Sequence, residues 1–263
     1  MNDQSRFVID NVDNLLTAIA KRDFGEAYPE ALAAWESFSE GIRNLIPCDL
    51  DQYGPYRCGV TYPLIFTQSF EEVKIPHVEW SWHEGGGIWN PIYNDGVFGD
   101  VDGSLMRLRH IREVVKHFDN GVKILDTLVK KMSFSYGGRQ SRQLAVARFI
   151  LCSYVTAMQV MEWNIAKRLL FKLKEGERPE RTEDLISAIG IREYSKTALG
   201  DYMKSLAERE NENVRLALSC WEEDSSLGFE ASMEYAFSDV FAEWKERETE
   251  KSLALLDEYL NQF

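Results

Sequence analysis

Residues 104–129 read SLMRLRHIREVVKHFDNGVKILDTLV, and this stretch decides the fold class. Its apolar side chains recur at alternating steps of three and four residues, the spacing of one face of an amphipathic helix. They are Leu105, Leu108, Ile111, Val115, Phe118, Val122, Leu125 and Val129. Ser104 is a favourable N-cap for this helix. So narrow an apolar stripe is typical of a helix in a bundle.

The segments on either side of this stretch repeat the helical pattern. Residues 1–47 predict a helical hairpin, in which a short first helix stops at Gly25 and a second begins near Pro29. Residues 104–173 predict a long helix pair, whose second member is apolar around much of its circumference and suits the centre of a bundle. Residues 182–263 predict the C-terminal helices. We therefore expect an all-α fold, an irregular bundle of about seven helices that forms a single domain over residues 1–263.

The last helix is expected to combine an apolar part with a charged part. The side chains expected to pack inward are Met233, Phe237, Val240, Phe241 and Trp244. The charged run at residues 245–251 is expected to face solvent, because charged side chains are rarely buried unless they are paired.

Charge and composition exclude several classes of function. With 43 acidic and 30 basic residues the formal net charge is -13, which makes nucleic acid or an anionic membrane an unfavourable partner. The N-terminus lacks the pattern of a signal peptide, and Arg148, Ser153 and Gln159 interrupt the longest apolar stretch. The four cysteines, Cys48, Cys58, Cys152 and Cys220, are scattered. We expect reduced thiols, a cytoplasmic location and no cofactor.

An insertion rich in aromatic residues and glycine separates the two helical parts at residues 48–103. A loop of this length is usually functional or disordered, and its aromatic content argues against disorder. Sugar rings pack on aromatic faces while their hydroxyls pair with polar side chains, so the insertion is a candidate glycan site. The candidate ligand-binding residues are Tyr53, Tyr56, Arg57, Trp80, Trp82, His83, Glu84, Trp89, Asn90 and Tyr93. The alternatives are a flexible turn at the glycines 85–87 and an aromatic core between helical layers.

Other chemistry finds less support in the sequence. A short extended stretch is expected at residues 73–82. If residues 77–84 are extended, His77, Glu79, Ser81 and His83 share one side, and the two imidazoles and the carboxylate could ligate a metal. The spacing matches no known metal motif, so hydrogen-bonded histidines are expected instead. The spacing of His110 and His117 places both on one helix face, where the same explanation suffices. The glycines lack the lysine of a phosphate loop, and no G-x-S-x-G elbow or facing carboxylate pair is identifiable. We therefore expect no metal and name no catalytic residue.

Several short motifs resemble one region of some large bacterial proteins. They are RDFG at residues 22–25, AWESFSE at 34–40, DQYGPYR at 51–57, YPL at 62–64 and DSSLGFE at 224–230. In these motifs the chain is similar to the helical region that follows the catalytic (β/α) barrel in uncharacterised glycoside-hydrolase-like proteins of the hexosaminidase type. The resemblance covers most of the chain.

The resemblance implies a carbohydrate-active context, in which the helical region packs on a barrel and its aromatic loop lines one side of the substrate cleft. No barrel precedes these helices, and because the family's catalytic residues belong to the barrel, none can be carried over. The expected function is an accessory domain or subunit, either a separate or truncated C-terminal region or a descendant without hydrolytic activity. Its expected partners are a glycan and a barrel-domain chain. The alternative is a helical protein-interaction or scaffold protein with no ligand site.

Overall fold

The computed structural model describes residues 4–45, 59–68, 73, 101–132, 138–228 and 237–263. The α-helices are α1 (Gln4–Phe24), α2 (Tyr28–Arg43), α3 (Val101–Lys131), α4 (Arg139–Lys174), α5 (Thr182–Ala188), α6 (Lys196–Glu223) and α7 (Asp239–Asn261). Short 3-10 helices are η1 (Gly25–Ala27), η3 (Gly59–Thr61) and η5 (Ser225–Gly228). No strand occurs in these ranges. The all-α class is therefore confirmed for the part of the chain that the structure describes.

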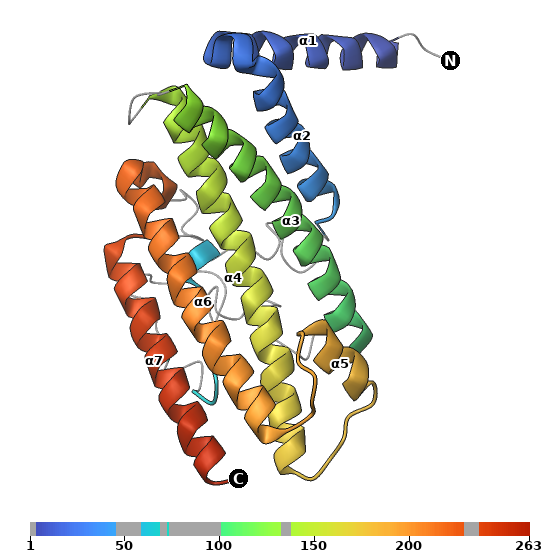
Figure 1. The fold of residues 1–263 in the computed structure, drawn as a ribbon, viewed down its shortest axis with the longest axis vertical. Helices are drawn as coiled ribbons and strands as arrows, with labels where there is room; N and C mark the ends of the chain where they lie inside the picture. Colours follow the sequence, from blue (N-terminus) through green and yellow to red (C-terminus); the bar gives the residue numbers. More distant parts are fainter. Residues whose placement is uncertain (1–3, 46–58, 69–72, 74–100, 133–137, 229–236) are drawn as a thin grey trace.

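Helix α4 is the centre of the bundle. It packs against α3 on one side and α6 on the other, while α2 packs on α3 and α7 packs on α6 (Figure 1). Its buried side chains include Leu144, Trp163 and Leu170, which lie along almost its whole length. The short α5 contacts α3 and α4 at one end of the bundle, and α1 crosses the opposite end (Figure 1). The apolar circumference expected at residues 140–173 explains this central position.

Helix α4 is also long and apolar enough, by length and composition, to cross a membrane. Most of its apolar window is nevertheless buried inside the protein, between the helices beside it. The core helix of a globular protein passes the same test, so this finding is weak evidence for a membrane span. The cytoplasmic location remains a prediction.

The first two helices differ from the expected antiparallel hairpin. Helix α1 has 21 residues and is not short, although it ends at Phe24 beside the expected stop. Gly25 follows with a φ of 58°, a left-handed conformation that favours glycine. The chain then turns sharply into α2, so that α1 lies across the end of the bundle and its N-terminal half leads away from the junction (Figure 1).

An irregular segment at residues 59–66 is buried between α4 and α7. Every residue in it is buried, and side chains from the two helices donate hydrogen bonds to three of its carbonyl groups. Trp163 Nε1 donates to the carbonyl of Ile65 over 2.9 Å, Lys245 Nζ donates to that of Val60 over 2.5 Å, and Ser252 Oγ donates to that of Leu64. Buried carbonyl groups without a regular partner need such donors.

This segment corrects part of the expectation that residues 245–251 face solvent, since Arg247, Glu250 and Lys251 are exposed but other residues of the run are buried. Lys245, Thr249 and Ser252 have no exposed surface, and they occur on the same helical stripe as the buried Leu256. Lys245 and Ser252 are tolerated on this stripe because they donate hydrogen bonds to carbonyl groups of the buried segment. Val240, expected to pack inward, is instead exposed, whereas Phe237, Phe241 and Trp244 are buried as expected.

Candidate functional site

The residues expected to bind a glycan cannot be placed by the structure. Tyr53, Tyr56, Arg57, Trp80, Trp82, His83, Glu84, Trp89, Asn90 and Tyr93 all lie outside the described residues. So do Met233, His77, Glu79, Cys48 and Cys58, together with residues 74–82 of the expected extended stretch. The glycan site, its alternatives and the metal alternative therefore stay predictions.

Within the described ranges, no group of three histidine, cysteine or carboxylate side chains could hold a metal ion. His110 and His117 are both partly buried on α3, and His117 Nε2 lies 3.9 Å from Glu113 Oε2. Cys152 and Cys220 are free and buried. Burial raises the pKa of both thiols, that of Cys220 to about 11, so neither is a nucleophile at neutral pH.

The most perturbed ionisable groups lie in a closed site. Lys245 of α7 and Glu210 of α6 form an ion pair without exposed surface, and Thr156 Oγ1 donates to Glu210 over 2.6 Å. Burial raises the pKa of Glu210 and lowers that of Lys245, because loss of water penalises both charged forms, while their mutual attraction opposes both shifts. No substrate can reach groups that are fully covered, so we assign this cluster to the core.

The described surface contains a large apolar groove between α2 and α4, with α3 as its floor. It encloses about 800 Å³. Its lining consists of Trp35, Phe38 and Ile42 from α2, Phe118 and Leu125 from α3, and Arg139, Arg142, Gln143, Val146, Ala147 and Ile150 from α4. The spacing of the α4 residues is that of one helical face, and Ile42, Val146 and Ile150 are exposed. A smaller hollow of about 330 Å³ occurs beside it, between Glu30 and Lys131.

Two glycines set the depth of this groove. A Cβ atom on Gly41 would lie 2.8 Å from the Phe118 ring, and a Cβ atom on Gly121 would collide with the Phe38 ring. Because glycine has no Cβ atom, α2 and α3 approach closely at these positions. The rings of Phe38 and Phe118 then pack with their centroids 5.1 Å apart. Tyr154 of α4 packs on the other side of Phe118, at 4.7 Å. The floor is therefore rigid and aromatic.

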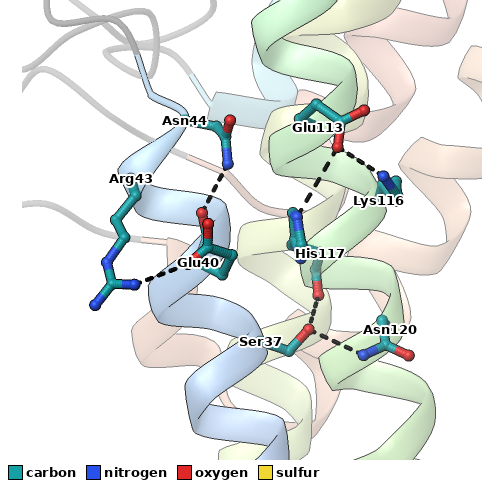
Figure 2. A network of polar contacts seen from close by, with 8 residues as sticks. All are labelled: Ser37, Glu40, Arg43, Asn44, Glu113, Lys116, His117 and Asn120. Carbon is teal, nitrogen blue, oxygen red and sulfur yellow. Dashed lines mark hydrogen bonds and ion pairs between the residues drawn. The ribbon is translucent and has the colours of Figure 1, made fainter.

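Hydrogen bonds hold the α2 wall on the α3 floor. Ser37 Oγ donates to the carbonyl of His117 over 2.8 Å and accepts from Asn120 Nδ2 over 3.0 Å (Figure 2). Glu40 and Glu113 instead pair within their own helices, with Arg43 and Lys116 (Figure 2). The link between the two helices is thus short and neutral, and it lies on the core side of the groove wall.

Asp23 fixes α1 to one end of the groove. Its buried carboxylate pairs with Arg22 and with Arg139 Nη1, both over 2.7 Å, and Gln143 Nε2 lies 3.3 Å away. The hydrogen bond from Arg22 and the charge of both guanidinium groups lower the pKa of Asp23 to about 2, against the opposing effect of burial. Phe24 then packs edge-on against Trp35, at 6.3 Å. The RDFG motif is thus a helix junction in this structure.

The groove carries a cation, Arg142, that forms no ion pair with the described part of the chain. Arg139 is committed to Asp23, but the exposed Arg142 has no ion pair or side-chain hydrogen bond with any described residue. Its charge contributes to lowering the pKa of Asp224, although the hydrogen bonds from Ser226 are the larger cause. The site therefore offers an apolar cleft with an exposed guanidinium group at its edge that forms no ion pair with the described residues.

Comparison with models of known protein families, with curated proteins and with solved structures gives no match to this chain. The class that fold and site define is an all-α protein with an open apolar groove. The sequence does not reveal the groove, because the apolar stripe of Trp35, Phe38 and Ile42 has the same pattern on a buried helix face as on an open one. The exposed apolar pair Val146 and Ile150 could not be told from the core positions of the same helix, since α4 is apolar around most of its circumference.

Proposed function

We propose that this chain is a helical protein-interaction domain whose groove between α2 and α4 binds an acidic amphipathic helix of another polypeptide. The observation that carries the proposal is the open apolar cleft with the unpaired Arg142 at its edge. A contiguous apolar surface exposed to water is costly, at about 25 cal/mol per Å² of apolar area, and marks an interaction site more often than an isolated exposed residue does.

The shape and chemistry of the cleft favour a helix as its occupant. Its two walls are helices with an aromatic floor between them, and helix-in-groove recognition uses apolar anchors spaced at i, i+3, i+4 and i+7. Arg142 favours a carboxylate beside those anchors, since an acidic side chain would pair with a guanidinium group that has no ion pair with any described residue.

Binding of a labelled peptide tests this proposal. The probe is a designed helix with leucines at i, i+3, i+4 and i+7 and glutamates beside them, and its counterpart carries lysines in their place. Fluorescence anisotropy should show tighter binding of the acidic peptide. Val146→Asp should weaken binding of the acidic peptide by about tenfold or more, because the substitution places a charge in the apolar wall of the groove. Val240→Asp is the matched control, since Val240 is 42% exposed and Val146 is 37% exposed. Equal affinities of the two variants, or no binding, would contradict the proposal.

The second candidate is the carbohydrate-active accessory function, with a glycan and a barrel-domain chain as partners. It is favoured by the aromatic composition of residues 48–94 and by the resemblance, both of which are observations on the sequence. Titration with a broad panel of soluble glycans should quench the fluorescence of Trp80, Trp82 or Trp89. An unchanged spectrum across the panel, together with no barrel-domain protein binding the purified chain, would remove this candidate.

A further inference from the structure

We infer that the helix bound in the groove is α1 of a second copy of this chain, so that two copies form a reciprocal dimer. This inference rests on the proposed function and names its partner. Three observations support it: the free apolar stripe of α1, a charge match between that stripe and the groove, and the position of α1 at the end of the groove.

The free stripe lies in the middle of α1, from Val12 to Ile19. Val12, Leu15 and Leu16 are exposed, with Leu15 at 59%, and Ile19 is partly buried. These four positions have the i, i+3, i+4 and i+7 spacing of anchors that enter a groove. The helix is held only near its C-terminal end within the described residues, where Ala20, Asp23 and Phe24 are buried. Three exposed apolar side chains on one face are a surface that an interaction partner would cover.

The charges of the two surfaces are complementary. Asp13 lies beside the stripe, is exposed, and has no ion pair or side-chain hydrogen bond with any described residue. Arg142 is the unpaired cation of the groove. The whole chain carries a charge of -13, which opposes association of two copies at long range. A local pair between Asp13 and Arg142 would oppose this repulsion at the contact and fix the orientation of the helix.

The position of α1 favours exchange between two copies. Asp23 binds Arg139 and contacts Gln143, so the C-terminal end of α1 lies at the end of its own groove. The stripe lies about 10 to 16 Å further along a continuous helix, at 1.5 Å per residue, and leads away from the junction with α2 (Figure 1). It therefore misses its own groove. Two α1 helices placed antiparallel about a two-fold axis would each bring their stripe to the other copy's groove.

A charge exchange between copies is the decisive test. Asp13→Arg alone places two arginines opposite each other, and Arg142→Asp alone places two aspartates opposite each other. Sedimentation velocity experiments on the full chain should show that the dimer dissociation constant of each variant alone is at least about tenfold higher than that of the wild type. In an equimolar mixture of the two variants, both contacts again join opposite charges, and the affinity should return to within about threefold of the wild type.

A second pair of variants tests the apolar part of the contact. Leu16→Asp should abolish the dimer, and Leu216→Asp, on α6, should leave it intact. The two leucines are 40% and 44% exposed, so both monomers should fold, which circular dichroism verifies. A dimer insensitive to these changes, or a mixture that stays monomeric, would overturn the inference. A monomeric wild type that still binds the acidic peptide would overturn the dimer alone. A monomeric wild type that binds neither a second copy nor the acidic peptide would overturn the proposed function as well.

Discussion

The ion pair between Lys245 and Glu210 joins α7 to α6 with no exposed surface on either side chain. Lys245 Nζ also donates to the carbonyl of Val60, so a single ammonium group connects two helices and the buried irregular segment. Glu210 Oε2 has no hydrogen-bond partner in the described structure. The pair thus depends on one carboxylate oxygen, and each member needs the other to remain buried.

Removing one member of this pair should destabilise the protein strongly. We expect Glu210→Leu or Lys245→Met to lower the free energy of unfolding by about 3–5 kcal/mol, because the remaining charge is buried without its partner. The double variant should be more stable than either single variant. Urea denaturation measures all three. The control is the exposed pair of Lys204 and Asp257, at 2.6 Å, where Lys204→Ala should cost less than about 1 kcal/mol. Additive single effects would contradict this account.

Acid should weaken the junction at Asp23. The folded protein lowers the pKa of this carboxyl from 3.8 to about 2, so its contribution to stability is present above pH 3.8 and is lost as the pH falls through 2. We expect a contribution of about 1 kcal/mol, less than the full shift implies, because both guanidinium partners are more than half exposed. Urea midpoints between pH 5 and pH 2 should fall less steeply in Asp23→Asn than in the wild type. If the urea midpoints of Asp23→Asn and the wild type fall in parallel with pH, Asp23 contributes nothing to the acid dependence of stability.

A methyl group on Gly121 should separate α2 from α3. Gly121→Ala places a Cβ atom against three atoms of the Phe38 ring, and we expect a loss of about 1–3 kcal/mol despite the higher helix propensity of alanine. Because Phe38 lines the groove, binding of the acidic peptide should weaken too. Gly200→Ala is the control, since its Cβ atom meets one methyl group of Leu260, which can rotate away. Thermal unfolding, followed by circular dichroism, compares the two variants. Equal melting temperatures would contradict the close approach of Phe38 to Gly121.

The two buried thiols should be unreactive in the folded protein. In a background of Cys48→Ser and Cys58→Ser, a thiol reagent at pH 8 should label Cys152 and Cys220 only as the protein unfolds, since both are covered and have a raised pKa. The exposed Ser219 provides the positive control, because Ser219→Cys places a thiol one residue away from Cys220. Rapid labelling of the background variant under native conditions would contradict the burial of these groups.

The sequence predicted the long helices well, and for a clear reason. Leu108, Ile111, Phe118, Val122 and Leu125 repeat with the period of a helix, and they are the buried face of α3. Ser104, expected to cap the N-terminus of this helix, instead lies in its first turn, because α3 begins at Val101. Local spacing determines such elements, so they can be inferred without knowledge of the partners.

The sequence could not show which distant residues each helix face contacts. The stripe through Lys245 and Ser252 looked solvated because its hydrogen-bond acceptors occur about 185 residues earlier in the chain. The same limit applies to the candidate site. The spacing of Val12, Leu16 and Ile19 is that of a helix, but the pattern of an apolar stripe is the same whether its own chain covers it or leaves it open. The groove is formed by α2, α3 and α4 together. Its open side depends on how these helices are arranged in space, which the spacing of residues within one helix does not determine.

The buried segment at residues 59–66 also bears on how the chain is made. Its carbonyl groups receive hydrogen bonds from residues separated by 185 and 188 positions, near the end of the polypeptide. During synthesis α2, α3 and α4 can associate as they leave the ribosome, whereas this segment has no donors from α7 until the last helix emerges. Contacts between such distant parts of a chain form slowly. The nascent chain must therefore hold an unfinished interior until α7 has emerged, and that interval is when a chaperone would have most to protect.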